Sequence, residues 1–83
     1  MASSLWDSDN RVLQDLLKEM RLVAGLTQVE LSNLLNRPQS YVSKYESGER
    51  RLDLTEVRNI TIFCGSNLKE LVDLLEIKLD KKA

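Results

Sequence analysis

The chain has 83 residues, of which 42% are hydrophobic and 30% are charged, and its formal net charge is −1. This length is enough for one small domain, and the slightly acidic charge argues mildly against a non-specific nucleic-acid binder, which is usually strongly basic. One cysteine and no histidine exclude a disulfide within the chain and argue against a metal site, so Cys64 is interpreted as a small core residue and no cofactor is expected.

The N-terminal end shows neither a targeting signal nor a membrane segment. No apolar run approaches the ~18 residues that a membrane span requires. The start, MASSLWDSDN, lacks the basic residues and apolar core of a secretory signal. We therefore expect a cytoplasmic protein that does not enter a membrane.

The first helix is predicted to follow an N-terminal arm formed by residues 1–8. Either Ser4 or Asp9 is suited to cap this helix, and Gly25 is expected to end it. Trp6 extends the apolar stripe if the helix starts early; otherwise it packs back onto the core or across a dimer. The stripe itself has helical spacing and consists of Leu13, Leu17 and Met20.

The second helix is predicted to begin at Thr27. Thr27 and Glu30 have the spacing of a capping box, in which each side chain accepts a hydrogen bond from a free backbone N–H. Asn36 tolerates the left-handed conformation that ends a helix. One face of this helix carries Leu31, Ser32 and Leu35.

The third helix is predicted from Pro38 to Ser47, with Gly48 ending it. At ~100° per residue, Val42 and Tyr45 lie on the apolar face and Tyr41 lies at its border. The opposite, polar arc consists of Gln39, Ser40, Ser43 and Lys44. Amides and cations are the groups that read base edges in a DNA major groove, and small hydroxyls allow close approach. The alternative interpretation is an ordinary solvated face.

Two more helices are predicted after the Glu49-Arg50-Arg51 turn. Asp53 and Glu56 form a second capping pattern at the start of the fourth helix, whose inward stripe is Leu54, Val57, Ile60, Thr61 and Cys64. The inward stripe of the fifth helix is Leu68, Leu71, Val72 and Leu75. Both helices carry apolar residues that these stripes do not use: Ile62, Phe63, Leu74, Ile77 and Leu79.

These patterns together predict an all-α fold. No stretch shows period-two alternation, and there is no repeat, linker or Gly-rich loop. We expect one compact five-helix domain over residues 9–77, followed by a charged tail over residues 78–83. Cations gather in the middle of the chain and acidic residues near its end, an asymmetry that suits a one-sided contact with a polyanion.

The stretch from residue 27 to residue 48 resembles the helix-turn-helix of the lambda-repressor-like (Cro/cI, XRE) family. The residues that carry the resemblance are Arg21, Thr27, Gln28, Leu31, Glu46 and Gly48, and the match extends from about Leu17 to Leu75. Three positions depart from the family pattern. Ser32 replaces the usual Ala, Arg37 replaces a small apolar residue, and Pro38 replaces a hydroxyl-bearing N-cap.

The resemblance implies that the third helix enters the major groove and that helices 2 and 3 form the helix-turn-helix. The base-reading residues would be Gln39, Ser40, Ser43 and Lys44, and the phosphate contacts would come from Gln28, Arg37, Tyr41, Arg50 and Arg51. It also implies that Arg21 pairs with Glu46, because a carboxylate beside an apolar face needs a partner and a guanidinium suits it.

The expected function is that of a sequence-specific DNA-binding repressor of transcription. One short helix reads few bases, so we expect a homodimer on an inverted-repeat operator. Its interface would be built from the surplus apolar residues Ile62, Phe63, Leu74 and Ile77. The alternative is an antitoxin or another module that uses the same fold to hold a partner protein. An enzyme is not expected, because without His a general base near neutral pH would have to be a carboxylate or lysine with a perturbed pKa, and the acidic residues are spread along solvated faces.

Overall fold

The computed structural model describes the backbone of residues 2–82 and the side chains of residues 8–81. Within this range there are five helices and no strand, which confirms the all-α prediction. The helices are α1 (Ala2–Val23), α2 (Gln28–Leu34), α3 (Tyr41–Ser47), α4 (Leu54–Phe63) and α5 (Leu68–Lys82).

Helix α1 begins at Ala2, so the expected N-terminal arm is helical, and neither Ser4 nor Asp9 marks the start of the helix. The physical reason is that no glycine or proline interrupts the sequence between Ala2 and Val23, and a formed helix extends at little cost per residue. The side chain of Trp6 lies outside the described residues. The helix ends as predicted near Gly25, whose φ of +76° is left-handed.

Helix α2 begins with the predicted capping box. The backbone N–H of Glu30 donates to Thr27 Oγ1 at 3.0 Å, and the N–H of Thr27 donates to Glu30 Oε1 at 2.8 Å. Asn36, with a φ of +57°, adopts the expected left-handed conformation after the helix. Both ends of α2 thus follow from local sequence.

Helix α3 begins at Tyr41 and not at Pro38, three positions later than predicted. The N–H of Tyr41 donates to the carbonyl oxygen of Pro38 at 2.9 Å, so the residues between them form a turn. Gln39 and Ser40 therefore precede the helix, and the Ser40 side chain makes no capping hydrogen bond. Gly48, with a φ of +88°, ends the helix as expected.

Helix α4 has the second predicted capping box, between Asp53 and Glu56. Two residues expected to face inward are exposed instead: Leu54 is 67% exposed and Val72 is 42% exposed. Leu54 is exposed because it is the first residue of α4. On α5, Leu71 takes the buried position and leaves its neighbour Val72 exposed.

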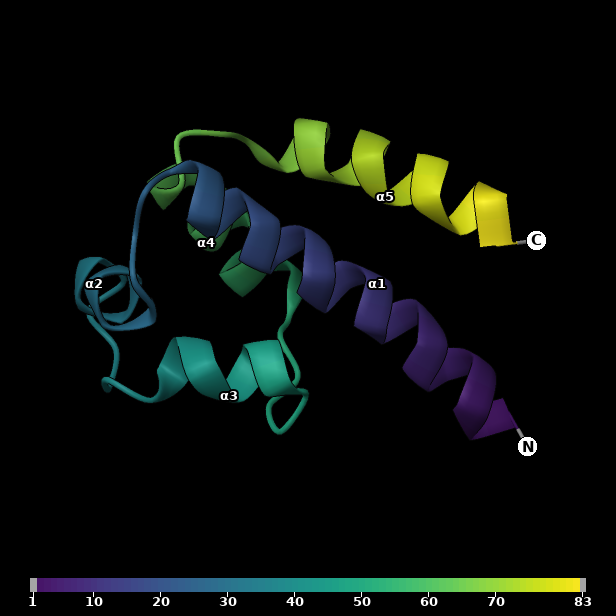
Figure 1. The fold of residues 1–83 in the computed structure, drawn as a ribbon, viewed down its shortest axis with the longest axis horizontal. Coiled ribbons are helices and arrows are strands. Elements are labelled where there is room, and N and C mark those ends of the chain that lie inside the picture. Colours follow the sequence, from purple (N-terminus) through teal and green to yellow (C-terminus); the bar gives the residue numbers. More distant parts are fainter. Residues whose placement is uncertain (1, 83) are drawn as a thin grey trace.

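Helix α1 is the central element, because it packs against α3, α4 and α5. In Figure 1, α3 and α5 lie on opposite sides of α1. The residues that are almost fully buried come from all five helices: Leu17, Leu31, Ser32, Val42, Tyr45, Ile60, Thr61 and Leu71. This arrangement leaves the outer face of α3 clear of α5.

Candidate nucleic-acid interface

The four residues predicted to read bases lie at the N-terminal end of α3. Gln39 and Ser40 are exposed in the turn before the helix, and Ser43 and the exposed Lys44 lie in its first turn. The Ser43 hydroxyl donates to the carbonyl oxygen of Ser40 at 3.0 Å, which ties the turn to the helix. Within the described residues, the side chains of Gln39 and Lys44 have no hydrogen-bond or ion-pair partner, so their amide and ammonium groups are available to an external acceptor.

The opposite face of α3 is buried. Val42 and Tyr45 are almost fully enclosed, and Tyr41 is 6% exposed. The N–H of Val42 donates to the Ser32 hydroxyl at 3.2 Å, and that hydroxyl donates to the Gln39 carbonyl oxygen. Ser32, where the family pattern usually has Ala, thus fixes the turn between α2 and α3 with two hydrogen bonds.

Tyr41 does not lie where a phosphate contact was expected. Its hydroxyl donates to Glu56 Oε2 at 2.9 Å, on the first turn of α4. Burial raises the pKa of Tyr41, and the hydrogen bond to Glu56 raises it further. Because the ring is buried and the hydroxyl is already engaged, we remove Tyr41 from the phosphate contacts. A border position on a helical wheel could not distinguish these two orientations.

A buried ion pair holds α3 against the rest of the domain. Arg21 Nε lies 2.7 Å from Glu46 Oε2 and Arg21 Nη2 lies 3.1 Å from Glu46 Oε1, so the two side chains that were expected to pair meet in a bidentate contact. The Arg21 and Glu46 side chains are only 7% and 5% exposed. The hydrogen bond to Glu46 raises the pKa of Arg21, which keeps its charge fixed.

Two further contacts complete this brace. Arg21 Nη1 donates to the carbonyl oxygen of Leu26 at 2.9 Å, just before α2. Gln28 Nε2 donates to Glu46 Oε1 at 2.9 Å. An amide nitrogen carries two N–H groups, so this bond leaves one for a further acceptor. The brace therefore links α1, α2 and α3 and fixes the direction in which the exposed face of α3 points.

A second cluster of polar contacts surrounds Glu56. Its Oε2 accepts hydrogen bonds from Arg50 Nη2 and the Tyr41 hydroxyl, and Arg37 Nη2 lies 3.6 Å away. Its Oε1 accepts the Asp53 N–H of the capping box at 3.0 Å. Burial alone would raise the pKa of Glu56, but the hydrogen bonds from the Asp53 N–H, Arg50 and Tyr41 together lower it. The sequence showed only a capping pattern here and gave no signal for the contacts across the chain.

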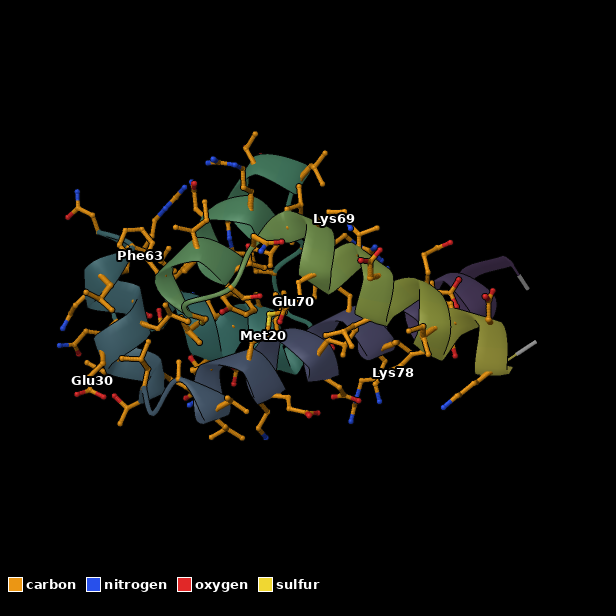
Figure 2. The ribbon with its side chains drawn as sticks, turned by 90° about the horizontal axis from the view of Figure 1, so that it is seen from above. Met20, Glu30, Phe63, Lys69, Glu70 and Lys78 are labelled. Atoms are coloured by element: carbon orange, nitrogen blue, oxygen red, sulfur yellow. The ribbon has the colours of Figure 1, made fainter. Side chains whose placement is uncertain are left out.

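The residues expected at a dimer interface are all at the surface of the single chain. Ile62 and Phe63 are exposed on α4, and Leu74 and Ile77 are exposed on α5. Figure 2 looks onto the α5 side, where Phe63 lies near one end of the face and Lys78 lies toward the other. A cleft of about 270 Å³ lies between α1, α5 and the loop that joins α4 to α5. Its lining is mixed: Leu16, Met20, Val23 and Leu74 are apolar, and Glu19, Glu70 and Lys78 are charged.

Comparisons with known proteins agree with this geometry. Residues 13–75 match the family model of a helix-turn-helix domain. A solved structure, an XRE-family like protein from Pseudomonas syringae pv. tomato, superposes with a TM-score of 0.85 at 40% sequence identity, over 93% of this chain and 94% of that one. The chain belongs to the XRE-type helix-turn-helix family. No curated protein sequence matches the chain significantly.

Membership of the XRE family supports a DNA-binding regulator in general terms, with α2 and α3 as its helix-turn-helix. Within the described residues, no helix is long and apolar enough to span a membrane, and no group of His, Cys, Asp and Glu side chains could hold a metal ion.

Proposed function

We propose that this XRE-family protein is a sequence-specific transcriptional repressor that binds an inverted-repeat operator as a homodimer. The observation that carries this proposal is that α3 has one buried face and one exposed face, which offers the unpaired ammonium group of Lys44 next to the unpaired amide of Gln39 in the turn before the helix.

The proposed base contacts come from the turn before α3 and from its first turn. Gln39 can form a bidentate pair with adenine, and Lys44 can donate to guanine O6 and N7, each worth ~1–3 kcal/mol of discrimination. Ser40 and Ser43 are small enough to let the backbone approach the groove. The start of α3 at Tyr41 supports this placement, because the N-terminal end of a recognition helix is the end that reaches base edges.

The proposed phosphate contacts surround these residues. Gln28 lies in the first turn of α2, where free backbone N–H groups favour an anion. Arg37 precedes α3, and Arg50 and Arg51 follow it. Contacts with the backbone add affinity and orientation but carry little sequence information.

The dimer is proposed from the exposed apolar residues Ile62, Phe63, Leu74 and Ile77. Since α5 and α3 lie on opposite sides of α1, contact through the α5 face leaves α3 uncovered (Figure 1). Exchanging Leu74 and Ile77 for lysine should yield monomers by light scattering while the melting temperature stays near that of wild type, because both side chains are exposed. A wild-type chain that is monomeric at high micromolar concentration would remove this interface.

The DNA contact is tested by comparing two classes of variant on the preferred site and on random DNA. Gln39→Ala and Lys44→Ala should weaken binding to the preferred site by ~1–3 kcal/mol and leave random DNA much less affected. Arg51→Ala should weaken both alike and lower the salt slope by ~0.9. Equal effects of both Gln39→Ala and Lys44→Ala on the two DNAs would show that neither α3 nor the turn before it reads the sequence.

A second candidate function is supported by the exposed apolar residues of α4 and α5, which could bind a partner protein as in an antitoxin. In that case the Leu74 and Ile77 variants would lose the partner, and the Gln39 and Lys44 variants would keep it.

A further inference from the structure

Glu56 organises two arginines that come from opposite ends of α3. Arg37 lies before the helix and Arg50 lies after it, yet both guanidinium groups reach the same carboxylate oxygen of Glu56. Both also lie over the Tyr41 ring, at 5.1 Å and 5.2 Å from its centroid. The three side chains and the ring therefore form one cluster, which we call the Glu56 cluster: Arg37, Tyr41, Arg50 and Glu56.

The position of Glu56 itself is firmly determined. Its Oε1 is held by the Asp53 N–H, its Oε2 accepts from Tyr41, and its side chain is only 12% exposed. The arginines are different, since 47% of the Arg37 side chain and 41% of the Arg50 side chain remain exposed. Each guanidinium is thus in contact with the domain, and a large part of each arginine side chain remains open to solvent.

The charge of the cluster still favours an anion. Two arginines and one glutamate give a net charge of +2 − 1 = +1. A guanidinium has five N–H donors, and the contacts inside the cluster use only part of them. A flexible arginine loses rotamer freedom when it binds, and a side chain that is already held in place loses less. In rotamer entropy, a preordered pair therefore has an advantage over two free arginines in binding a phosphate.

We propose that Glu56 is a positioning residue that holds Arg37 and Arg50 as one preordered pair for a single phosphate of the DNA backbone. This role rests on the proposed DNA-binding function and adds to it a residue that itself makes no contact with DNA. The competing possibility is that Glu56 weakens binding by repelling the phosphate and retaining Arg50. The two differ in the sign of the coupling between Glu56 and Arg50.

The test is a double-mutant cycle with Glu56→Gln and Arg50→Ala in the full chain, measured as affinity for the selected DNA site. With Glu56 as a positioning residue, Arg50→Ala weakens wild type by about tenfold but weakens the Glu56→Gln protein by no more than about threefold. The salt slope should fall by ~0.9 when Arg50 is removed from wild type, and by clearly less in the Glu56→Gln background. If Glu56 had a purely structural role, Glu56→Gln would change stability, but Arg50→Ala would have the same effect on affinity and on the salt slope in both backgrounds.

Glu30→Gln is the matched control, because Glu30 occupies the same place in the capping box of α2. Within the described residues Glu30 has no ion pair, so its replacement removes one negative charge and keeps a capping side chain. In this background Arg50→Ala should cost the same as in wild type. A smaller cost here would show that net charge, and not positioning, explains the Glu56 result.

A second cycle, between Arg37→Ala and Arg50→Ala, does not depend on whether the Glu56 variant folds. If the two arginines share one phosphate, the double variant should bind the DNA site at least about threefold more tightly than the product of the two single losses in affinity predicts. Additive effects, or a larger Arg50 effect in the Glu56→Gln protein, would overturn the role of Glu56. If wild type selects no DNA site at all, the proposed function fails first and this role fails with it.

Discussion

Removing one partner of the brace between Arg21 and Glu46 should destabilise the domain strongly. Glu46→Ala removes both carboxylate oxygens that Arg21 contacts, and it also removes the acceptor of Gln28. Arg21, whose side chain is only 7% exposed in the intact domain, would keep only its hydrogen bond to the Leu26 carbonyl oxygen. Because this strands a buried charge, we expect a loss of ~3–5 kcal/mol in the free energy of unfolding.

This loss is large compared with the total stability of such a chain. At ~0.05–0.15 kcal/mol per residue, a domain of this length has roughly 4–12 kcal/mol. One kcal/mol shifts the melting temperature of a small domain by ~4–8 °C, so Glu46→Ala should lower it by at least about 12 °C. Urea unfolding measures the free energy and thermal unfolding measures the melting temperature, both followed by circular dichroism at constant protein concentration.

Two controls decide whether burial is the cause. Arg11 and Asp15 form an exposed pair on the same helix, at 3.7 Å, with side chains about 70% exposed. Arg11→Ala should therefore cost less than ~1 kcal/mol. The double variant Arg21→Met with Glu46→Leu should cost much less than Glu46→Ala, since it removes both charges and keeps the volume. If Glu46→Ala were no worse than Arg11→Ala, the argument from burial would be refuted.

Three further predictions concern single side chains. The buried Tyr45 hydroxyl has no hydrogen-bond partner in the described part of the chain, and burial raises its pKa. Tyr45→Phe should therefore leave the free energy of unfolding unchanged or raise it by ~1 kcal/mol, and it should reduce unfolding at alkaline pH. A loss of more than ~1 kcal/mol would reveal a partner. Gly48→Ala should lower the free energy of unfolding in urea by ~1–2 kcal/mol, because Gly48 has a φ of +88°. Steric contact should add little to this cost, because the Gln14 amide that lies 3.2 Å from the added Cβ can move away. An unchanged urea midpoint would contradict this prediction. The pKa of Glu56 is lower in the folded than in the unfolded chain, so its stabilisation is present at neutral pH and is lost as the pH falls below 4.5 and through the folded pKa. Glu56→Gln should therefore flatten the acid limb of a curve of stability against pH. An acid limb identical to that of wild type would argue against the Glu56 cluster.

Local sequence patterns predicted the parts of the fold that local physics decides. The capping boxes at Thr27 and Asp53 and the left-handed residues at Asn36 and Gly48 depend on neighbours within a few positions, and the structure has them as expected. The Arg21–Glu46 pair joins residues that are 25 positions apart in the sequence, and only the family resemblance predicted it.

What sequence reasoning missed depends on tertiary packing. The periodicity of α3 could not show that Tyr41 turns inward to meet Glu56. The late start of α3 also follows from packing, because Ser32 and Val42 hold the preceding turn with hydrogen bonds that no sequence pattern marks. Whether the apolar residues exposed on α4 and α5 meet a second copy of the chain is a property of an assembly and stays a prediction.

Selection from random double-stranded DNA tests the central claim most directly, that the exposed face of α3 and the turn before it read sequence. Wild type should enrich an inverted repeat whose half-site centres lie about one helical turn, ~34–36 Å, apart. The same selection with Gln39→Ala should keep the repeat and its spacing but lose the preference at one position in each half-site. A wild-type pool without an enriched sequence, or a Gln39→Ala pool identical to that of wild type, would contradict the assignment of α3 and its preceding turn as the reading element.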